Sequence, residues 1–324
     1  MKSVLILGGT NFIGRVLVEK LLQRNDYAIT LFNRGKRNAG LFDSVPQIHG
    51  DRETDDYLKI AEQHWDYIID CSGYYPLSFD KLLHSLEGKV GRYIFVSTIS
   101  VFDMESIINR TVDESEPILP CSDAQKTSAL PDAYGEKKAE MERLLMQHTW
   151  LDKIIIRPSL VYGKYDFTDR FYYWLWRAKF SANIMLPNGG TDSVGITYVD
   201  DLADLIIASL SLEKHHTTYN AITHDVTFKE LLDTCTNLLG TNPTLVPVSS
   251  HDITEKDIQP WQDIALWLNG DLRISNQRAL HDYGIQFSSF ADSVKGTIAY
   301  YESLGWQACK YGLSVEKEQE LITS

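Results

Sequence analysis

The chain has 324 residues, 44% of them hydrophobic, and its 31 basic and 44 acidic side chains give a formal net charge of -13. This composition is ordinary for a soluble globular protein, and no apolar run approaches the roughly 18 residues of a membrane-spanning helix, so a membrane protein is not expected. Because the negative charge repels polyphosphate backbones and no long basic cluster offsets it, we expect no nucleic-acid partner.

The cysteines and histidines give no sign of a metal site. The four cysteines lie far apart in the sequence and form no CxxC pair, so neither a zinc site nor a disulfide framework is expected. The neighbouring His215 and His216 do not converge on one ion. The apolar run after Lys2 is too short for a signal peptide, and a cytoplasmic location fits best.

The start of the chain has the pattern strand, glycine turn, helix, strand. Residues 4–7 predict a buried parallel strand, residues 8–14 a glycine-rich turn and residues 28–32 a second strand. The helix predicted between them, over residues 12–24, has its apolar side chains on one face: Ile13, Val16, Leu17, Leu21 and Leu22. This succession fits a βαβ nucleotide-binding unit.

The glycine turn is a candidate site for a dinucleotide. Glycines let the backbone turn tightly into a helix whose free amides can face a pyrophosphate. An ordinary tight turn is the alternative, because glycine marks many connections. Asn11 interrupts the glycines, and its tolerance of a left-handed backbone preserves the turn. The residues expected to contact the cofactor here are Gly8, Thr10, Asn11, Phe12, Ile13 and Gly14.

Short apolar strands alternate with helical stretches up to about residue 157. This alternation predicts an α/β fold, with a doubly wound parallel sheet covered on both faces. The remaining strands are expected at residues 47–49, 67–71, 93–97 and 153–157, and the helices at residues 55–63, 79–86 and 134–148. Residues 103–133 are polar and contain proline, and predict a long loop over the carboxyl edge of the sheet, where ligands bind in such folds.

We divide the chain into a dinucleotide-binding domain, residues 1–160, and a smaller, mostly helical substrate domain, residues 161–310. Part of residues 195–225 is expected to return to the first domain. Helices are predicted at residues 200–212, 228–239, 275–283 and 290–304. The second of these begins at a capping-box signal, Thr227 with Glu230, and Gly240 ends it. Residues 311–324 are a polar tail that is expected to fray.

Candidate cofactor contacts follow the second, third and fourth strands. In an NAD site an acidic side chain after the second strand usually binds the ribose hydroxyls. This chain has Asn33 and Arg34 at that place, and Arg can pair with the extra phosphate of NADP, so we favour NADP over NAD. A solvated basic turn is the alternative. Asp51 follows the third strand and either receives the adenine amino group or forms a turn with Gly50. The fourth strand ends in Cys71, Ser72 and Gly73.

Four side chains near the same edge of the sheet are candidates for substrate binding or proton transfer. The hydroxyls of Ser97 and Thr98 end the fifth strand, where they reach a substrate or cap a loop. Tyr134 and Lys138 are four residues apart and share one helix face. A nearby ammonium lowers the pKa of a tyrosine, so Tyr134 can exchange a proton with a substrate hydroxyl, and Lys138 can also hold the nicotinamide ribose.

Together these motifs resemble the extended and atypical short-chain dehydrogenase/reductases of the NAD-dependent epimerase/dehydratase family. The resemblance runs from residue 1 to about residue 306, through residues 8–14, residues 97–102, Tyr134 with Lys138, residues 157–163 and residues 197–203. The family implies a Rossmann-type fold, with Thr98 as the catalytic hydroxyl, Tyr134 as the acid/base and Lys138 as its support. The chain departs from the usual pattern at Asn11, usually glycine, and at Phe102, usually tyrosine.

The same resemblance assigns further contacts. Arg157 and Pro158 lead from the sixth strand into the cofactor site, and Ser100 and Arg170 are assigned to the substrate. The aromatic run at residues 171–176 is either a buried helix face, which we favour, or a sugar-stacking surface. A small-molecule substrate of the nucleotide-sugar class and a homodimer are what the family implies.

The sequence therefore predicts an NAD(P)-dependent oxidoreductase, epimerase or dehydratase acting on a carbinol or carbonyl carbon. A non-catalytic NAD(P)-binding regulator is one alternative, but it has no use for Thr98, Tyr134 and Lys138. An RNA-binding protein of the chloroplast type, which the glycine turn also resembles, is the other. The net charge of -13 argues against it.

Overall fold

Seven apolar stretches form one parallel sheet in the computed structural model, which describes residues 1–213 and 215–323. The strand order is β11-β7-β5-β4-β1-β2-β3. These strands are β1 (Lys2–Leu7), β2 (Tyr27–Asn33), β3 (Gln47–His49), β4 (Trp65–Asp70), β5 (Val90–Val96), β7 (Asp152–Pro158) and β11 (Thr218–Ala221). Runs of Val, Ile and Leu suit this sheet because it is buried on both faces. The six predicted strands are confirmed.

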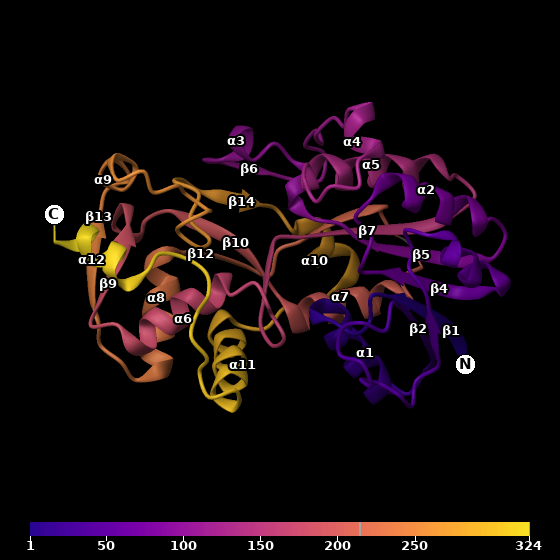
Figure 1. Cartoon of the computed structure of the whole chain (residues 1–324), viewed down its shortest axis with the longest axis horizontal. Coiled ribbons are helices and arrows are strands. Elements are labelled where there is room, and N and C mark those ends of the chain that lie inside the picture. Colours follow the sequence, from indigo (N-terminus) through magenta and orange to yellow (C-terminus); the bar gives the residue numbers. More distant parts are fainter. Residues whose placement is uncertain (214, 324) are drawn as a thin grey trace.

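Helices cover both faces of this sheet (Figure 1). On one face α1 packs against α7, and on the other α2 packs against α5. Their bounds are α1 (Phe12–Arg24), α2 (Pro76–Ser85), α5 (Tyr134–Gln147), α7 (Val199–Ser209) and α10 (Gln277–Tyr283). Leu22, expected on the buried face of α1, is 41% exposed, whereas Val18, which was not expected there, is fully buried. The helix predicted at residues 55–63 is a 3-10 segment, η1 (Asp55–Glu62).

The segment at residues 103–133 is more ordered than the long loop that the sequence predicts. It contains α3 (Met104–Ile107), β6 (Arg110–Val112) and α4 (Asp123–Thr127), and η2 (Ile99–Val101) precedes it. Strand β6 pairs in parallel with β14 (Leu272–Ile274) of a second sheet. Local periodicity could not reveal this strand, because its partner lies far away in the sequence.

The rest of the chain adds two small sheets to the expected helices. The first has the order β12-β10-β14-β6, with β8 beside β10, and the second pairs β13 with β9. The remaining strands are β8 (Leu160–Tyr162), β9 (Asn183–Pro187), β10 (Ser193–Tyr198), β12 (His224–Thr227) and β13 (Thr244–Val248). The helices are α6 (Arg170–Phe180), α8 (Phe228–Leu239), α9 (Ser250–Glu255), α11 (Phe290–Ser303) and α12 (Val315–Ile322), with a 3-10 turn, η3 (Asn188–Gly190). The predicted capping box of Thr227 and Glu230 begins α8, and Gly240 ends it.

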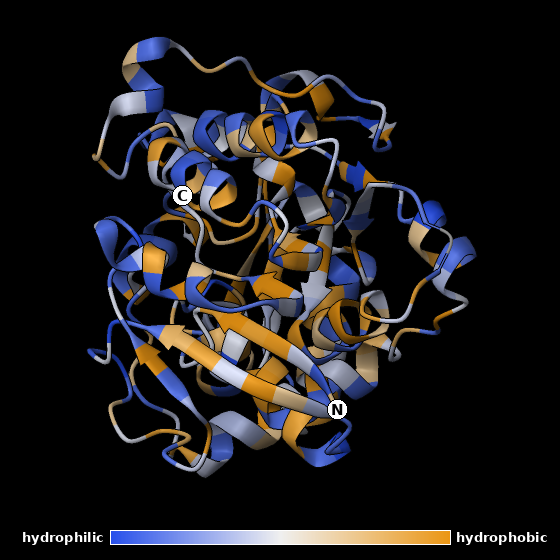
Figure 2. Ribbon diagram, turned by 90° about the vertical axis from the view of Figure 1, so that its right-hand side faces the viewer, coloured by the Kyte–Doolittle hydropathy of each residue, from blue (hydrophilic) through white to orange (hydrophobic). Residues whose placement is uncertain are grey.

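Figure 2 shows the apolar strands of the large sheet enclosed by helices that carry hydrophilic residues on their outer sides. None of the helices in the described part of the chain combines the length and the apolar character needed to cross a membrane. The aromatic run of α6 lies inside the second core, where four consecutive side chains are at most 2% exposed: Phe171, Tyr172, Tyr173 and Trp174. The buried helix face predicted for these residues is confirmed.

The end of the chain is a docked helix rather than the expected fraying tail. Ser314 caps α12, and Glu318 turns inward to meet Arg177 of α6 at 2.9 Å, with both side chains 2% exposed. The Arg177 guanidinium also donates to the carbonyl of Leu313, and Glu318 accepts from the backbone amide of Met185. The polar composition of this segment gave no sign of the ion pair, because Arg177 lies far from Glu318 in the sequence. Ser324 is outside the described residues.

Replacing Glu318 by Gln is expected to destabilise the protein. The change leaves the buried Arg177 guanidinium without a counter-charge, which costs about 3 kcal/mol of unfolding free energy. Urea unfolding of the variant measures this loss. Glu320→Gln, on the exposed side of the same helix, is the matched control. Equal stability of the two variants would mean that α12 is not anchored through Glu318.

Candidate active site

A cavity of about 1190 Å³ opens at the carboxyl edge of the large sheet. The ends of β1, β2, β4 and β5 form one side, and segments that follow β7 and β8 face them. Distant parts of the chain complete the wall with Pro260, Trp261, Gln262, Leu268, Leu272 and Tyr311. Ligands bind at this edge in open parallel sheets, so this cavity is the candidate active site.

The glycine turn forms the floor of one end of the cavity. Gly8 has φ +89°, and a Cβ there would lie 2.8 Å from the Cβ of Ser72. A Cβ on Gly14 would overlap the carbonyl oxygen of Gly8, so only glycine lets α1 approach the strand end this closely. Asn11 is extended, with φ -136° and ψ 144°, and the following residue, Phe12, takes a positive φ of 34°. The tolerance of asparagine for a left-handed backbone is therefore not used at Asn11.

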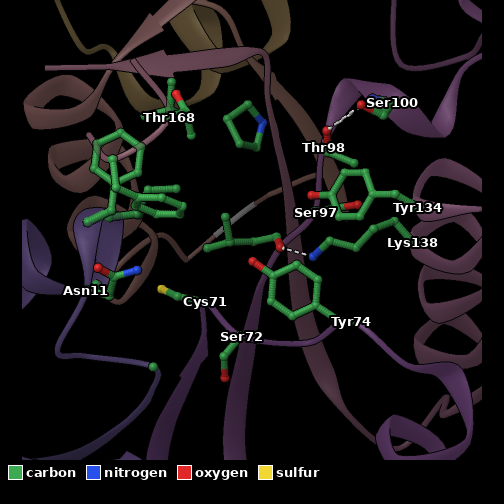
Figure 3. A pocket seen from close by; sticks show the side chains of 18 of the residues that line it. Asn11, Cys71, Ser72, Tyr74, Ser97, Thr98, Ser100, Tyr134, Lys138 and Thr168 are labelled. Atoms are coloured by element: carbon green, nitrogen blue, oxygen red, sulfur yellow. Dashed lines mark hydrogen bonds between the residues drawn. The ribbon is translucent and has the colours of Figure 1, made fainter. Parts of the chain in front are cut away.

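The start of α1 suits an anionic group. Asn11 occupies the N-cap position but makes no side-chain capping bond, so the first-turn amides of α1 keep their bonding capacity. Figure 3 shows the Asn11 side chain at the edge of the cavity, across from Cys71. The amides at this uncapped helix start can bind an anion, and the glycines beside it have no room for a side chain. Both features fit the pyrophosphate of a dinucleotide.

Cationic side chains gather where β2 ends. Arg34, Lys36 and Arg37 line the cavity, and Arg34 lies 3.8 Å from Asp51, with 58% of its side chain exposed. Asn33 lines it too, but its amide is bonded to Gln47 and to the backbone of Gly35. The end of β2 therefore presents an amide and three positive charges, with no carboxylate of its own.

A buried ionic network fixes the loop after β4. Arg52 donates to Asp70 at 2.7 Å and to the hydroxyl of Ser72 at 3.2 Å, and Tyr93 donates to the second oxygen of Asp70. The amide of Ser72 also donates to Asp70. Since Ser72 packs against Gly8, this network holds the loop after β4 against the glycine turn.

The predicted proton-transfer set lies together at the middle of the cavity. Figure 3 shows the side chains of Thr98, Tyr134, Lys138 and Tyr74 close together in the cavity, with the Lys138 ammonium bonded to a neighbouring oxygen. Thr98 donates to the hydroxyl of Ser100 at 3.1 Å and caps η2. The rings of Tyr74 and Tyr134 are 6.1 Å apart, and the Lys138 ammonium lies 5.6 Å from the Tyr74 ring.

The pKa of Tyr134 is raised, contrary to the expectation that Lys138 lowers it. Burial of the hydroxyl raises this pKa most and Tyr74 adds to the effect, while a hydrogen bond with Thr98 opposes it. The residue as a whole is 42% exposed, and it lines the cavity. The ammonium of Lys138 points away, donating to the carbonyl of Val96 at 2.7 Å. Tyr134 is therefore a protonated phenol in this arrangement, able to donate.

Lys138 is 3% exposed, and burial lowers its pKa to about 8, while the Asp70 carboxylate opposes the shift. The backbone carbonyl of Val96 and the ring of Phe95, 4.4 Å away, surround its ammonium. A lysine with this pKa changes its charge close to neutral pH, which is typical of active-site groups.

A second buried pair holds the helix that carries Tyr134 and Lys138. Glu142, one turn beyond Lys138 on α5, binds Arg157 of β7 through two bonds, Nε at 2.9 Å and Nη2 at 2.5 Å. Ser97 at the end of β5 donates to the same carboxylate. Helix α5 is thereby tied to two neighbouring strand ends.

The structure brings most of the predicted site residues to one cavity. Those that line it are Gly8, Thr10, Asn11, Phe12, Ile13, Gly14, Asn33, Arg34, Asp51, Cys71, Ser72, Thr98, Ser100, Tyr134, Lys138, Pro158 and Arg170. Gly73 and Arg157 do not line it. Gly73 packs against Met141 and Phe95, and Arg157 is 4% exposed in its pair with Glu142, so neither faces a ligand.

The sequence reasoning missed the wall at the far end of the cavity. Trp261 has φ +68° and lies 5.6 Å from the guanidinium of Arg170, and Tyr311 donates its hydroxyl to the Trp261 carbonyl. Phe167 contacts Phe12 edge to face at 6.1 Å. No local motif marks these residues, because they belong to irregular segments. Tyr74, two residues past Ser72, could have been suspected from its position after β4.

Three comparisons bear on this site. The model of the NAD dependent epimerase/dehydratase family matches residues 4–221. The chain is 25% identical to the chloroplast stem-loop binding protein of 41 kDa b from Arabidopsis thaliana, over 81% of this chain and 70% of that protein. It is also 25% identical to UDP-glucose 4-epimerase of Vibrio cholerae, over 71% and 74% respectively.

Solved structures resemble the whole fold. UDP-glucuronic acid 4-epimerase from Bacillus cereus, in complex with UDP-glucuronic acid and NAD, superposes with a TM-score of 0.70 at 17% identity, covering 93% of this chain and 99% of that chain. dTDP-glucose 4,6-dehydratase from Bacillus anthracis, in complex with NAD, gives a TM-score of 0.70 at 17% identity, covering 94% and 97%. At this identity the likeness establishes the fold alone.

The low pKa of Lys138 predicts how stability depends on pH. The folded pKa of about 8 is below the ordinary value of 10.5, so between these values the unfolded chain binds more protons and stability rises with pH. Relative to Lys138→Met, wild-type protein should gain up to about 1 kcal/mol per pH unit above about pH 8. Urea unfolding at several pH values measures this difference.

The matched control for this experiment is Lys59→Met, at a lysine with 47% of its side chain exposed outside the cavity. Its stability relative to wild type should change little over the same pH range. A difference for Lys138→Met that is flat, or that falls as pH rises, would contradict the assignment of a buried, partly deprotonated lysine.

Proposed function

The chain belongs to the NAD dependent epimerase/dehydratase family, and we propose that it transfers a hydride between a nicotinamide cofactor and a carbinol or carbonyl carbon, with Tyr134 as the acid/base. Membership of this family makes it an NAD-dependent enzyme of the oxidoreductase type. The main support for the proposal is that Thr98, Tyr134 and Lys138 line the same cavity as the glycine turn.

Each group has a distinct task. The bound nicotinamide would accept or supply the hydride at its C4 carbon. Tyr134 exchanges the hydroxyl proton of the substrate, donating it when a carbonyl is reduced and accepting it when a carbinol is oxidised. Thr98 orients the substrate oxygen. Lys138, charged below its pKa of about 8, favours the phenolate form of Tyr134 once its ammonium turns from Val96 toward the cavity.

The raised pKa of Tyr134 keeps its phenol protonated in the cofactor-free site. A phenol that holds its proton serves the reduction of a carbonyl, because the proton is available to the oxygen as the hydride arrives. Oxidation of a carbinol needs the phenolate. Movement of the Lys138 ammonium toward the tyrosine supplies the stabilising charge for this second direction.

We propose NADP as the preferred cofactor and NAD as the second choice. Arg34, Lys36 and Arg37 surround the end of β2, and Asn33 replaces the carboxylate that would bind ribose hydroxyls. The 2′-phosphate of NADP needs cations at this place. The B. cereus and B. anthracis neighbours hold NAD, so the proposed preference rests on residues of this chain and not on the fold.

We propose a sugar-like substrate, with nucleotide sugars as the first class to try. The B. cereus neighbour holds UDP-glucuronic acid. In this chain Arg170 lines the cavity, donates from Nε to Thr168 and lies 5.6 Å from the Trp261 ring. The guanidinium can pair with an anionic group while the aromatic wall covers an apolar or planar one.

A role in binding RNA is the second candidate, because one relative is a chloroplast stem-loop binding protein. The net charge of -13 opposes it, and the basic residues Arg34, Lys36 and Arg37 lie in the cavity lining rather than along an extended surface. A gel-shift titration with a stem-loop RNA at several salt concentrations distinguishes the two candidates.

Replacing Tyr134 by Phe should abolish turnover while leaving cofactor binding nearly intact. The phenyl ring keeps the packing against Tyr74 but has no proton to exchange, so we expect a loss of about a hundredfold or more. Reduction of bound NADP by UDP-glucose and by dTDP-glucose, followed through nicotinamide absorbance in a single turnover, measures the effect.

Fluorescence titration with NADPH then reports whether the Tyr134→Phe variant still binds cofactor. Tyr57→Phe, outside the cavity, is the control and should turn over at the wild-type rate. A Tyr134→Phe variant that retains activity would refute the catalytic assignment, and a wild-type protein that binds neither NADPH nor NADH would refute the proposed function as a whole.

Replacing Arg34 by Ala should weaken NADPH binding by about tenfold and leave NADH binding almost unchanged. The guanidinium can form a charge-assisted bond only with the extra phosphate of NADPH. Titration of the protein with each nucleotide gives the two dissociation constants. Arg24→Ala, an exposed arginine at the far end of α1, is the control. Equal losses for NADPH and NADH in the Arg34 variant would contradict the preference for NADP.

A further inference from the structure

Outside the cavity, three side chains that can bind a metal meet between α2 and the end of α5. Asp80 and His84 are four residues apart on α2 and therefore share one face of the helix. His148 is the C-cap residue of α5. Asp80 Oδ1 lies 3.3 Å from His84 Nδ1 and 3.9 Å from His148 Nε2, and the three ligand atoms all lie within 4.8 Å of one another.

These distances are close to those of a zinc site. Zinc binds imidazole nitrogen and carboxylate oxygen at about 2.0–2.2 Å, so neighbouring ligand atoms of a tetrahedral site are about 3.3–3.5 Å apart. The Asp80 to His84 pair already meets this spacing, and the His148 nitrogen needs to approach the Asp80 oxygen by about half an ångström. The two imidazole nitrogens are at most 4.8 Å apart and need to approach by up to about 1.4 Å. The two imidazole rings are nearly perpendicular, at 82°, with centroids 4.9 Å apart, so they do not block one another.

The exposure of the two histidines also suits a metal. His148 has 11% of its side chain exposed, and its Nε2 faces the Asp80 carboxylate. His84 has 66% of its side chain exposed and can turn toward the ion without disturbing the core. Its Nδ1 now bonds to the backbone carbonyl of Asp80, and this single bond would be exchanged for the metal.

The charges around the cluster favour a cation on balance. Asp80 supplies a carboxylate with 36% of its side chain exposed, and Glu87 adds a negative charge near His148. The ammonium of Lys153 opposes them, but it is held 2.7 Å from the carbonyl of His148, on the backbone side of that residue. Imidazole ligands select zinc and its transition-metal neighbours over magnesium and calcium, which require oxygen.

We propose that Asp80, His84 and His148 form a binding site for a divalent transition-metal ion such as Zn²⁺, with water completing the coordination. None of the three residues lines the active-site cavity, so this site is independent of the proposed function. An ion held there links α2 to the end of α5, the helix that carries Tyr134 and Lys138. The site would thus stabilise the helix pair beside the catalytic groups.

An ordinary ion pair between neighbouring turns of a helix is the competing explanation for Asp80 and His84. The chain contains such a pair elsewhere, because His251 and Glu255 of α9 are also four residues apart, 3.3 Å from each other, with 77% and 66% of their side chains exposed. They belong to no three-residue cluster of this kind in the described part of the chain. His251 therefore provides a matched control.

The test is a calorimetric titration of tag-free, EDTA-stripped full-length protein with ZnCl₂, together with thermal unfolding with and without the ion. We expect wild-type protein to bind one equivalent that His84→Gln and Asp80→Asn bind about tenfold or more weakly. Wild-type protein should also unfold at a higher temperature with zinc, and the two variants should lose most of this rise. His251→Gln should match wild type in both measurements.

The difference between variants is the readout, because free cysteines elsewhere can also take up zinc. Both substitutions change partly or largely exposed side chains on the surface of α2, so they should fold like the wild type without metal, which the unfolding curves check. If His84→Gln and Asp80→Asn bind zinc as wild type does, or if His251→Gln loses as much binding as they do, the proposed site is refuted.

Discussion

The bidentate pair of Glu142 and Arg157 is the interaction on which the rest of the active site depends. Both side chains are almost fully buried, and Ser97 adds a third bond to the same carboxylate. The pair fixes α5 against the ends of β5 and β7. Tyr134 and Lys138 precede Glu142 on the same helix face at intervals of four residues, so their positions over the sheet edge follow from this attachment. Loss of either partner would leave a buried charge and release the catalytic helix.

The same device recurs at two other places. Arg52 and Asp70 join the loop after β4 to the glycine turn through Ser72, and Arg177 with Glu318 joins the last helix to α6. Buried ion pairs of this kind contribute little net stability when compared with apolar packing, but they require one geometry, since a misplaced partner leaves an unpaired charge. In this protein they lie where distant segments must meet around the cavity.

The cavity combines family features with features of this chain. The glycine turn, Thr98, Tyr134 and Lys138 fall within the part of the chain that the family model matches. The far wall does not, because Trp261 and Tyr311 lie beyond residue 221. The relatives share the fold at 17% identity in the solved structures, yet their named substrates differ from one another, as expected when loops around a common sheet edge select the ligand.

The sequence alone determined the parallel sheet and its covering helices, because these depend on local periodicity. It also determined the grouping of the glycine turn with Thr98, Tyr134 and Lys138, because parallel strands end at one edge of a sheet. Tertiary structure decided what depends on distant partners. It placed Arg157 in a pair with Glu142, paired β6 with β14, docked α12 through Glu318 and brought Trp261 and Tyr311 to the cavity. It also raised the pKa of Tyr134, because burial outweighed the expected effect of a lysine whose ammonium points elsewhere. Such contacts leave no local pattern in a single sequence.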